Sequence, residues 1–251
     1  MKTTNFLSIF PLKKPIIGMI HLWGNGREDI LKRAKREVDV MLKNGIDAVL
    51  VENYFGAPTD IENVLEWLSK EKPDIIYGVN FLSGNMPEER SFIMASVFGA
   101  KFIQIDSVAG HLLTTPVDQD GRFATELDRL RSTYRIPVIG GVRFKYQPVI
   151  SGRTEAEDLK IGMQRCDAIA VTGSGTGVET DSQKIKTFRS VIGDFPLVVA
   201  AGLTADNCLE QMAIADAAIV GSFLKDTYKD RGEVSRDHVR QLVKKVKTLR
   251  K

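Results

Sequence analysis

Short runs of aliphatic and β-branched residues recur about every thirty residues, and this rhythm constrains the fold more than any other feature of the chain. The runs begin at Pro15, Asp47, Ile75, Lys101, Pro137, Asp167, Pro196 and Ala217. Helical patterns lie between them, such as Ile30, Ala34, Val38 and Met41. Apolar strands that alternate with helices indicate a parallel sheet buried on both faces. The sequence therefore predicts an α/β fold, a (β/α)8 TIM barrel.

A doubly wound open sheet is the alternative arrangement of such units. No G-x-G-x-x-G follows the first run, and eight evenly spaced units favour a closed ring. A chain of 251 residues with 43% hydrophobic content has the size of one such barrel. We expect one domain over residues 1–251, with residues 1–14 as a lead-in and residues 235–251 as a basic amphipathic helix.

The positive charge is concentrated in that last helix. Residues 235–251 hold seven Lys or Arg against one Asp, so the rest of the chain is acidic although the net charge is +3. Val239, Leu242, Val243, Val246 and Leu249 recur at helical spacing and predict a buried stripe with a solvated basic face. No aromatic residues interleave with the charges, so neither nucleic-acid binding nor peripheral membrane contact is favoured.

The chain is expected to be cytoplasmic. No apolar run approaches the roughly 18 residues of a membrane-spanning helix, and the polar start MKTTNFLSIFPLKK does not resemble a secretory signal. Cys166 and Cys208 lie in apolar surroundings, which predicts small buried side chains and neither a disulfide nor a reactive thiol.

In a barrel of this kind the residues that end the strands surround the substrate. Here these positions are unusually polar: His21, Glu52 with Asn53, Asn80, Asp106, Arg143 with Lys145, Thr172 with Gly173, Gly202, and Gly221 with Ser222.

Glycine-rich segments follow three of the strands. Val171–Asp181 contains Gly173, Thr176 and Gly177 before a helix, and Gly202 and Gly221-Ser222 follow the next two strands. Glycine lets backbone N–H groups approach an anion, and the last two loops of a barrel often hold phosphate. These residues predict a phosphate site. The glycines could instead serve tight turns, and Thr204 to Asn207 could cap a helix.

Glu52 and Asp106 are the candidate general bases, with Asn80 between them as a neutral ligand. The same two carboxylates could hold a divalent metal, although the sequence requires no cofactor. The structural alternative for Glu52 is a salt bridge to Lys145 or Arg143. Carboxylates at this depth must be paired or solvated in either case.

Three basic side chains complete the predicted mouth. Lys145 is expected to bind an anion or to act in acid–base chemistry, and Arg143 is expected to grip a carboxylate or phosphate unless it forms a structural ion pair. His21 is expected to transfer protons unless it is a structural histidine. His111 and His238 offer no zinc-ligand spacing with it.

The motifs together resemble the BtpA/SgcQ family over nearly the whole length. The matching pieces are G-M-I-H-L at Gly18, D-A-V-L-V-E-N at Asp47, G-V-N at Gly78, D-x-D-G at Asp118, V-T-G-x-x-T-G from Val171 with Asp181, A-G-L-T-x-D-N, and I-V-G-S-x-x-K. The resemblance implies a barrel similar to the ribulose-phosphate-binding barrels, and with it phosphosugar or related anionic ligands.

The chain departs from the family pattern at the rim. It has L-W-G-N-G from Leu22 where a proline-rich segment is usual, and Ser83-Gly84-Asn85 where R-N-D is usual. Phe144 to Pro148 keeps the family's lysine and loses its histidine. These departures predict an altered substrate or a lost activity.

Two classes of function follow from this reading. The first is an enzyme of isomerase or aldolase type acting on a phosphorylated sugar or a nucleoside-derived anion. The second is a non-catalytic assembly, biogenesis or regulatory factor that binds a ligand or a protein partner. A deep charged cleft would favour the enzyme, and apolar patches on the outer helices would favour the second class. A homo-oligomer is expected in either case.

Overall fold

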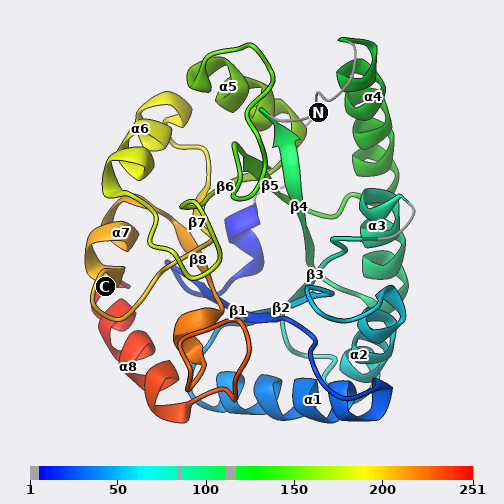
Figure 1. Cartoon of the computed structure of the whole chain (residues 1–251), viewed down its shortest axis with the longest axis vertical. Coiled ribbons are helices and arrows are strands. Elements are labelled where there is room, and N and C mark those ends of the chain that lie inside the picture. Colours follow the sequence, from blue (N-terminus) through cyan, green and yellow to red (C-terminus); the bar gives the residue numbers. More distant parts are fainter. Residues whose placement is uncertain (1–5, 84–85, 111–116, 251) are drawn as a thin grey trace.

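Eight parallel strands close into a barrel in sequence order in the computed structural model, which describes residues 6–83, 86–110 and 117–250. Figure 1 shows the ring of strands with the helices outside it. The strands are β1 (Ile16–Ile20), β2 (Ala48–Glu52), β3 (Tyr77–Asn80), β4 (Phe102–Ala109), β5 (Val138–Val142), β6 (Ala168–Val171), β7 (Leu197–Val199) and β8 (Ala217–Val220). β1 pairs with β8, which closes the ring and confirms the barrel over the open sheet.

The helices follow the strands one for one. They are α1 (Arg27–Lys43), α2 (Pro58–Glu71), α3 (Pro87–Phe98), α4 (Val117–Tyr134), α5 (Glu155–Arg165), α6 (Ser182–Ile192), α7 (Cys208–Ile214) and α8 (Arg236–Val246), with short 3-10 turns η1 (Phe6–Ile9), η2 (Ser222–Leu224) and η3 (Lys247–Leu249). In the part of the chain that the structure describes, no helix is long and apolar enough to cross a membrane.

The N-terminal lead-in closes the amino-terminal end of the barrel. Figure 1 shows the dark-blue η1 segment inside the ring of strands. The rings of Phe6 and Phe102 lie edge to face at 5.9 Å, and Phe10 packs against both. A side chain at Gly78 would lie 2.3 Å from the Phe102 ring, so glycine is required there. These rings fill the amino-terminal end of the barrel, so a ligand is expected at the carboxyl ends of the strands.

Two predicted boundaries are wrong. Asp106 was expected to end the fourth strand, but β4 continues to Ala109, and its pairing with β5 shifts register between Ile105 and Ala109. A bulge of this kind re-aims side chains beside a site. The basic helix was expected over residues 235–251, but α8 ends at Val246 and the 3-10 turn η3 follows it.

Other expectations from the sequence are confirmed. α8 buries Val239, Leu242, Val243 and Val246 against the barrel, whereas Leu249 in η3 is only partly buried. The segment Val171–Asp181 precedes a helix as expected, since α6 begins at Ser182 and the Asp181 side chain accepts a bond from the Gln183 N–H. Cys166 and Cys208 are buried free thiols. Gly84, Asn85 and His111 lie outside the described residues, as does the Asp118 side chain.

Candidate functional site

The inward-facing side chains at the carboxyl ends of the strands form the floor of the candidate site. Glu52 and Asn80 are paired in register on β2 and β3. His21 follows β1, and Asp106 lies in the bulged part of β4. Because successive side chains of a strand alternate between the barrel interior and the helices, these polar groups stand above the apolar interior.

Asn80 joins the two carboxylates through one amide. Its Nδ2 donates to Oε2 of Glu52 at 2.8 Å and to Oδ1 of Asp106 at 3.0 Å. Oδ1 of Asp106 also accepts a bond of 2.7 Å from Nε2 of Gln104. The donor nitrogen of Asn80 lies where a shared cation would need an oxygen ligand. The three side chains therefore fit a hydrogen-bonded acid pair and do not fit a metal site.

The acid pair is desolvated. Burial and the nearby Asp106 carboxylate raise the pKa of Glu52 to about 8, although Lys145 and the Asn80 amide oppose the shift. Burial likewise raises the pKa of Asp106 against the bonds from Gln104 and Asn80. A pair of carboxyls in this setting holds a proton near neutral pH. Among the described residues, no three His, Cys, Asp or Glu side chains are grouped as metal ligands.

Lys145 lies beside this acid pair without a direct ion pair to it. Its charge lowers the pKa values of Glu52, Asp106 and His21 relative to what burial alone would give. The Lys145 backbone N–H donates to Oγ1 of Thr172 at 2.8 Å, which fixes the start of the loop after β5. In the described part of the chain, Glu52 forms no ion pair with Lys145 or Arg143, so the salt-bridge alternative is not the arrangement found.

Arg143 is turned away from the acid pair. Its Nε donates to Oδ2 of Asp158 at 2.9 Å, and another guanidinium nitrogen donates to the Arg153 carbonyl at 2.7 Å. Asp158 is fully buried, so its charge needs these cations. Arg143 therefore forms the structural ion pair that was the alternative to ligand binding. Its contacts give no support to the expected binding of a ligand carboxylate or phosphate.

His21 is held as a neutral imidazole. Burial, with the charges of Lys225 and Lys145, lowers its pKa to about 3. Its Nδ1 lies 3.2 Å from the Asp230 carbonyl oxygen, which can only accept, so Nδ1 carries the proton and Nε2 is an acceptor. The expected proton transfer near neutral pH does not fit this state, whereas a hydrogen bond from a ligand hydroxyl to Nε2 does.

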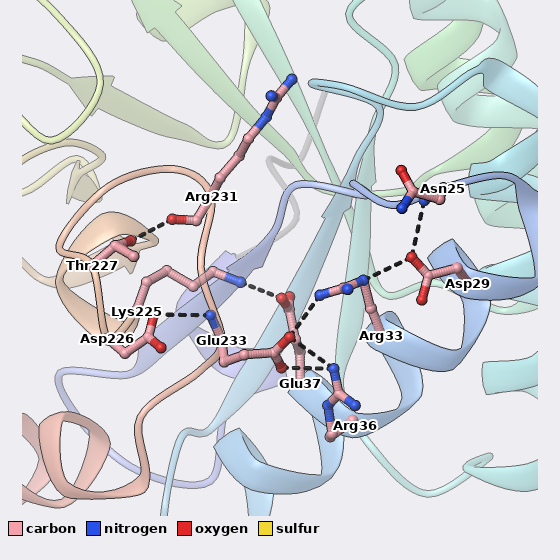
Figure 2. Close-up of polar contacts among 10 residues, drawn as sticks. All are labelled: Asn25, Asp29, Arg33, Arg36, Glu37, Lys225, Asp226, Thr227, Arg231 and Glu233. Carbon is pink, nitrogen blue, oxygen red and sulfur yellow. Dashed lines mark hydrogen bonds and ion pairs between the residues drawn. The ribbon is translucent and has the colours of Figure 1, made fainter.

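The segment after β8 brings Asp230 to His21. Figure 2 shows Lys225 reaching Glu37 on α1 and Glu233 lying between Arg33 and Arg36. Lys225 is fully buried, and the Thr227 hydroxyl bonds the Arg231 carbonyl within the same turn. These contacts fix the turn on the rim of the barrel, where the Arg231 guanidinium lies 4.1 Å from the Phe55 ring centroid.

Five of the predicted phosphate residues, from three loops, line one cavity of about 120 Å³, and Gly173 is not among them. A side chain at Gly221 would lie 2.8 Å from the His21 ring, and one at Gly177 would lie 3.1 Å from Oγ of Ser222. Gly202 has φ 67°, and a Cβ there would lie 2.2 Å from the Val178 carbonyl oxygen. The cavity is lined by His21, Lys145, Thr176, Gly177, Gly202, Gly221 and Ser222, among others.

Two wider hollows continue from this cavity around the mouth. Lys145 also lines a hollow of about 710 Å³ that includes Thr172 and Gly173, and Gln147 joins this hollow to one of about 280 Å³ beside Asp106. Thr176 closes the rim through its N–H, which donates to the Tyr146 hydroxyl at 2.7 Å. The three hollows thus form one charged groove, linked through Lys145 and Gln147, and Asp106 lines the hollow at one end.

The sequence reading missed Gln104 and the rim residues Tyr54, Tyr146 and Tyr228. Gln104 precedes Asp106 by two positions on one strand, so strand alternation alone would have placed both inside the barrel. The tyrosines carried no such signal, because loop conformation decides where their rings lie.

Comparison with known sequences agrees with this architecture. The BtpA family matches residues 12–248 of the chain. The chain belongs to the BtpA family. It is 27% identical to an uncharacterized protein of Methanocaldococcus jannaschii, over 92% of this chain and 94% of that protein. It is 25% identical to the photosystem I biogenesis protein BtpA of Synechocystis, over 86% of this chain and 82% of that protein.

Solved structures confirm the barrel. The phosphoribosyl anthranilate isomerase of Thermus thermophilus superposes with a TM-score of 0.60 and 15% identity, covering 94% of this BtpA-family chain and 100% of that one. At this identity the likeness concerns the fold alone.

Proposed function

We propose that this BtpA-family barrel is an enzyme that acts on a phosphorylated sugar or a nucleoside-derived anion by isomerase or aldolase-type proton transfer. The observation that carries the proposal is the pair of desolvated carboxylates joined by Asn80, with Lys145 beside them. Strongly perturbed acids in a cleft are typical of catalytic sites.

The acid pair is suited to moving a proton. A carboxyl whose pKa is raised to about 8 can give a proton near neutral pH, and its ionised partner can take one. In the proposed step, one carboxylate removes the proton on the carbon next to a carbonyl group, and the C–H electron pair forms an enolate. Lys145 stabilises the negative charge on the enolate oxygen, and the second carboxyl returns a proton.

The phosphate group would lie in the glycine-lined cavity. Gly177, Gly202 and Gly221 keep side chains out of it, while Lys145 supplies a positive charge and Ser222 a hydroxyl. The Thermus isomerase is named for a phosphoribosyl compound, which is consistent with a phosphate at this end.

The name of the Synechocystis relative favours a second candidate, an assembly or biogenesis factor. Its expected signature is an apolar patch on the outer helices. The exposed large apolar side chains of the described residues include Val97 on α3 and Leu209 on α7, whereas Tyr146, Val149, Val178 and Tyr228 lie on loops. The charged groove gives the enzyme the stronger support. A homo-oligomer stays a prediction, which light scattering of the purified protein would measure.

Thermal denaturation against phosphosugars, nucleotides and divalent cations tests the proposal. A ligand at about 100 times its Kd raises the free energy of unfolding by ~2.7 kcal/mol. We expect one phosphorylated compound to stabilise the protein selectively, and Gly221→Val to abolish the effect. With that compound as substrate, Glu52→Gln should lower kcat by about 10²–10⁴-fold. No response to any phosphorylated compound would favour the assembly factor instead.

A further inference from the structure

The hollow beside Asp106 differs in chemistry from the glycine-lined cavity. It has a volume of about 280 Å³ and opens between the ends of β3 and β4. Phe81, Leu82 and Pro87 form an apolar side, and Gln104, Asp106 and Ser107 form a polar side. Neither Lys nor Arg is among the described residues that line it.

Gln104 presents an unpartnered acceptor in this hollow. Gln104 is only 3% exposed, and its Nε2 donates to Oδ1 of Asp106 at 2.7 Å. Its Oε1 is then directed away from Asp106, and it has no hydrogen-bond partner in the described part of the chain. A buried acceptor without a partner costs about 1–3 kcal/mol, which a ligand donor would offset.

Further acceptors lie beside it. Oδ1 of Asp106 already accepts bonds from Asn80 and Gln104, so the other carboxylate oxygen is available to a ligand. Oγ of Ser107 is buried and unpartnered among the described residues. Glu88 adds a further carboxyl to the lining. Such a surface attracts hydrogen-bond donors and repels a phosphate.

We propose that this hollow is a subsite for a planar amine- or amide-bearing group, such as an aminated heterocyclic base, whose N–H donors meet Gln104 and Asp106. The apolar side formed by Phe81, Leu82 and Pro87 would contact the flat faces of the ring. The inference rests on the proposed function and deepens it, because it places the nitrogenous end of the substrate beside Asp106, in a hollow that shares no lining residue with the glycine-lined cavity.

Phosphate-free bases test the subsite by itself. We expect adenine and cytosine to bind at least about tenfold more tightly than purine and 2-pyrimidinone, which lack the amino group, in calorimetric or NMR titrations. Gln104→Met should remove this preference, and Ser107→Ala should weaken it. The inference would be overturned, on wild-type protein alone, if adenine bound no more tightly than purine and cytosine no more tightly than 2-pyrimidinone. It would also be overturned if neither adenine nor cytosine bound.

Ribose 5-phosphate tests the other end in the same experiment. We expect it to bind wild type and Gln104→Met equally, which also shows that the variant is folded. If adenine binds selectively and ribose 5-phosphate does not bind, the subsite stands and the proposed phosphate site fails. If ribose 5-phosphate binds and the bases show no preference, the phosphate site stands and the subsite fails.

Discussion

Nδ2 of Asn80 donates a 2.8 Å hydrogen bond to Oε2 of Glu52 across the β2–β3 pair, inside the mouth of the barrel. The same nitrogen donates to Asp106, so one neutral amide holds two acids close together. Their shared burial makes the protonation of the site sensitive to pH, and the stability of the protein is linked to it.

Glu52 should make the protein less stable as pH rises. Its folded pKa of about 8 exceeds its ordinary pKa of 4.5, so its contribution is fully present below pH 4.5 and is lost as pH rises through about 8. Glu52→Gln should remove this loss, and the variant should gain stability over wild type between pH 5 and 9. Urea denaturation across this range measures it. Parallel curves for the two proteins would contradict the raised pKa.

His21 should make the protein less stable as pH falls. Its folded pKa of about 3 lies below its ordinary pKa of 6.5, so its contribution is present above pH 6.5 and is lost as pH falls toward 3. NMR of the imidazole nitrogens should show a neutral ring with the proton on Nδ1 at pH 5. An imidazole that titrates near pH 6.5 would refute the assignment.

Removing one partner of the buried ion pair between Lys225 and Glu37 should destabilise the protein strongly (Figure 2). Lys225→Met leaves the Glu37 carboxylate without its partner and should lower the free energy of unfolding by about 3–5 kcal/mol. The double variant Lys225→Met/Glu37→Leu should recover most of this loss, because no charge is then buried. Chemical denaturation of both variants provides the comparison, and an equally unstable double variant would contradict it.

Gly202 should tolerate no side chain. Gly202 and Gly152 have nearly the same φ, 67° and 68°, but a Cβ at Gly202 would lie 2.2 Å from the Val178 carbonyl oxygen, whereas nothing lies within 4 Å at Gly152. Gly152→Ala should cost about 1–2 kcal/mol for the left-handed backbone alone. Gly202→Ala should cost clearly more. Equal losses in thermal or chemical denaturation would show that the close approach does not matter.

Local pattern was sufficient to locate the strands. The eight apolar runs predicted from the sequence all became strands, because residues buried on both faces must be apolar whatever surrounds them. The same pattern could not show that β4 continues past Asp106, since a bulge depends on the register with β5.

The identity of a charged residue likewise did not decide its partner. Arg143 and Lys145 are two positions apart, yet Arg143 is paired with the buried Asp158 and Lys145 lies beside the acid pair. The positive φ of Arg143 and the contacts of α5 place its guanidinium. Neither can be deduced from the residues next to Arg143 in the sequence.

The sequence by itself determined the barrel, the family and which residues stand at the ends of the strands, because these follow from periodicity and motif. Only the tertiary structure decided that Asn80 joins Glu52 to Asp106, that His21 is neutral, and that Gln104 has an unpartnered acceptor. Those properties arise from distances between strands and from the exclusion of water, and both exist only once the chain has closed on itself.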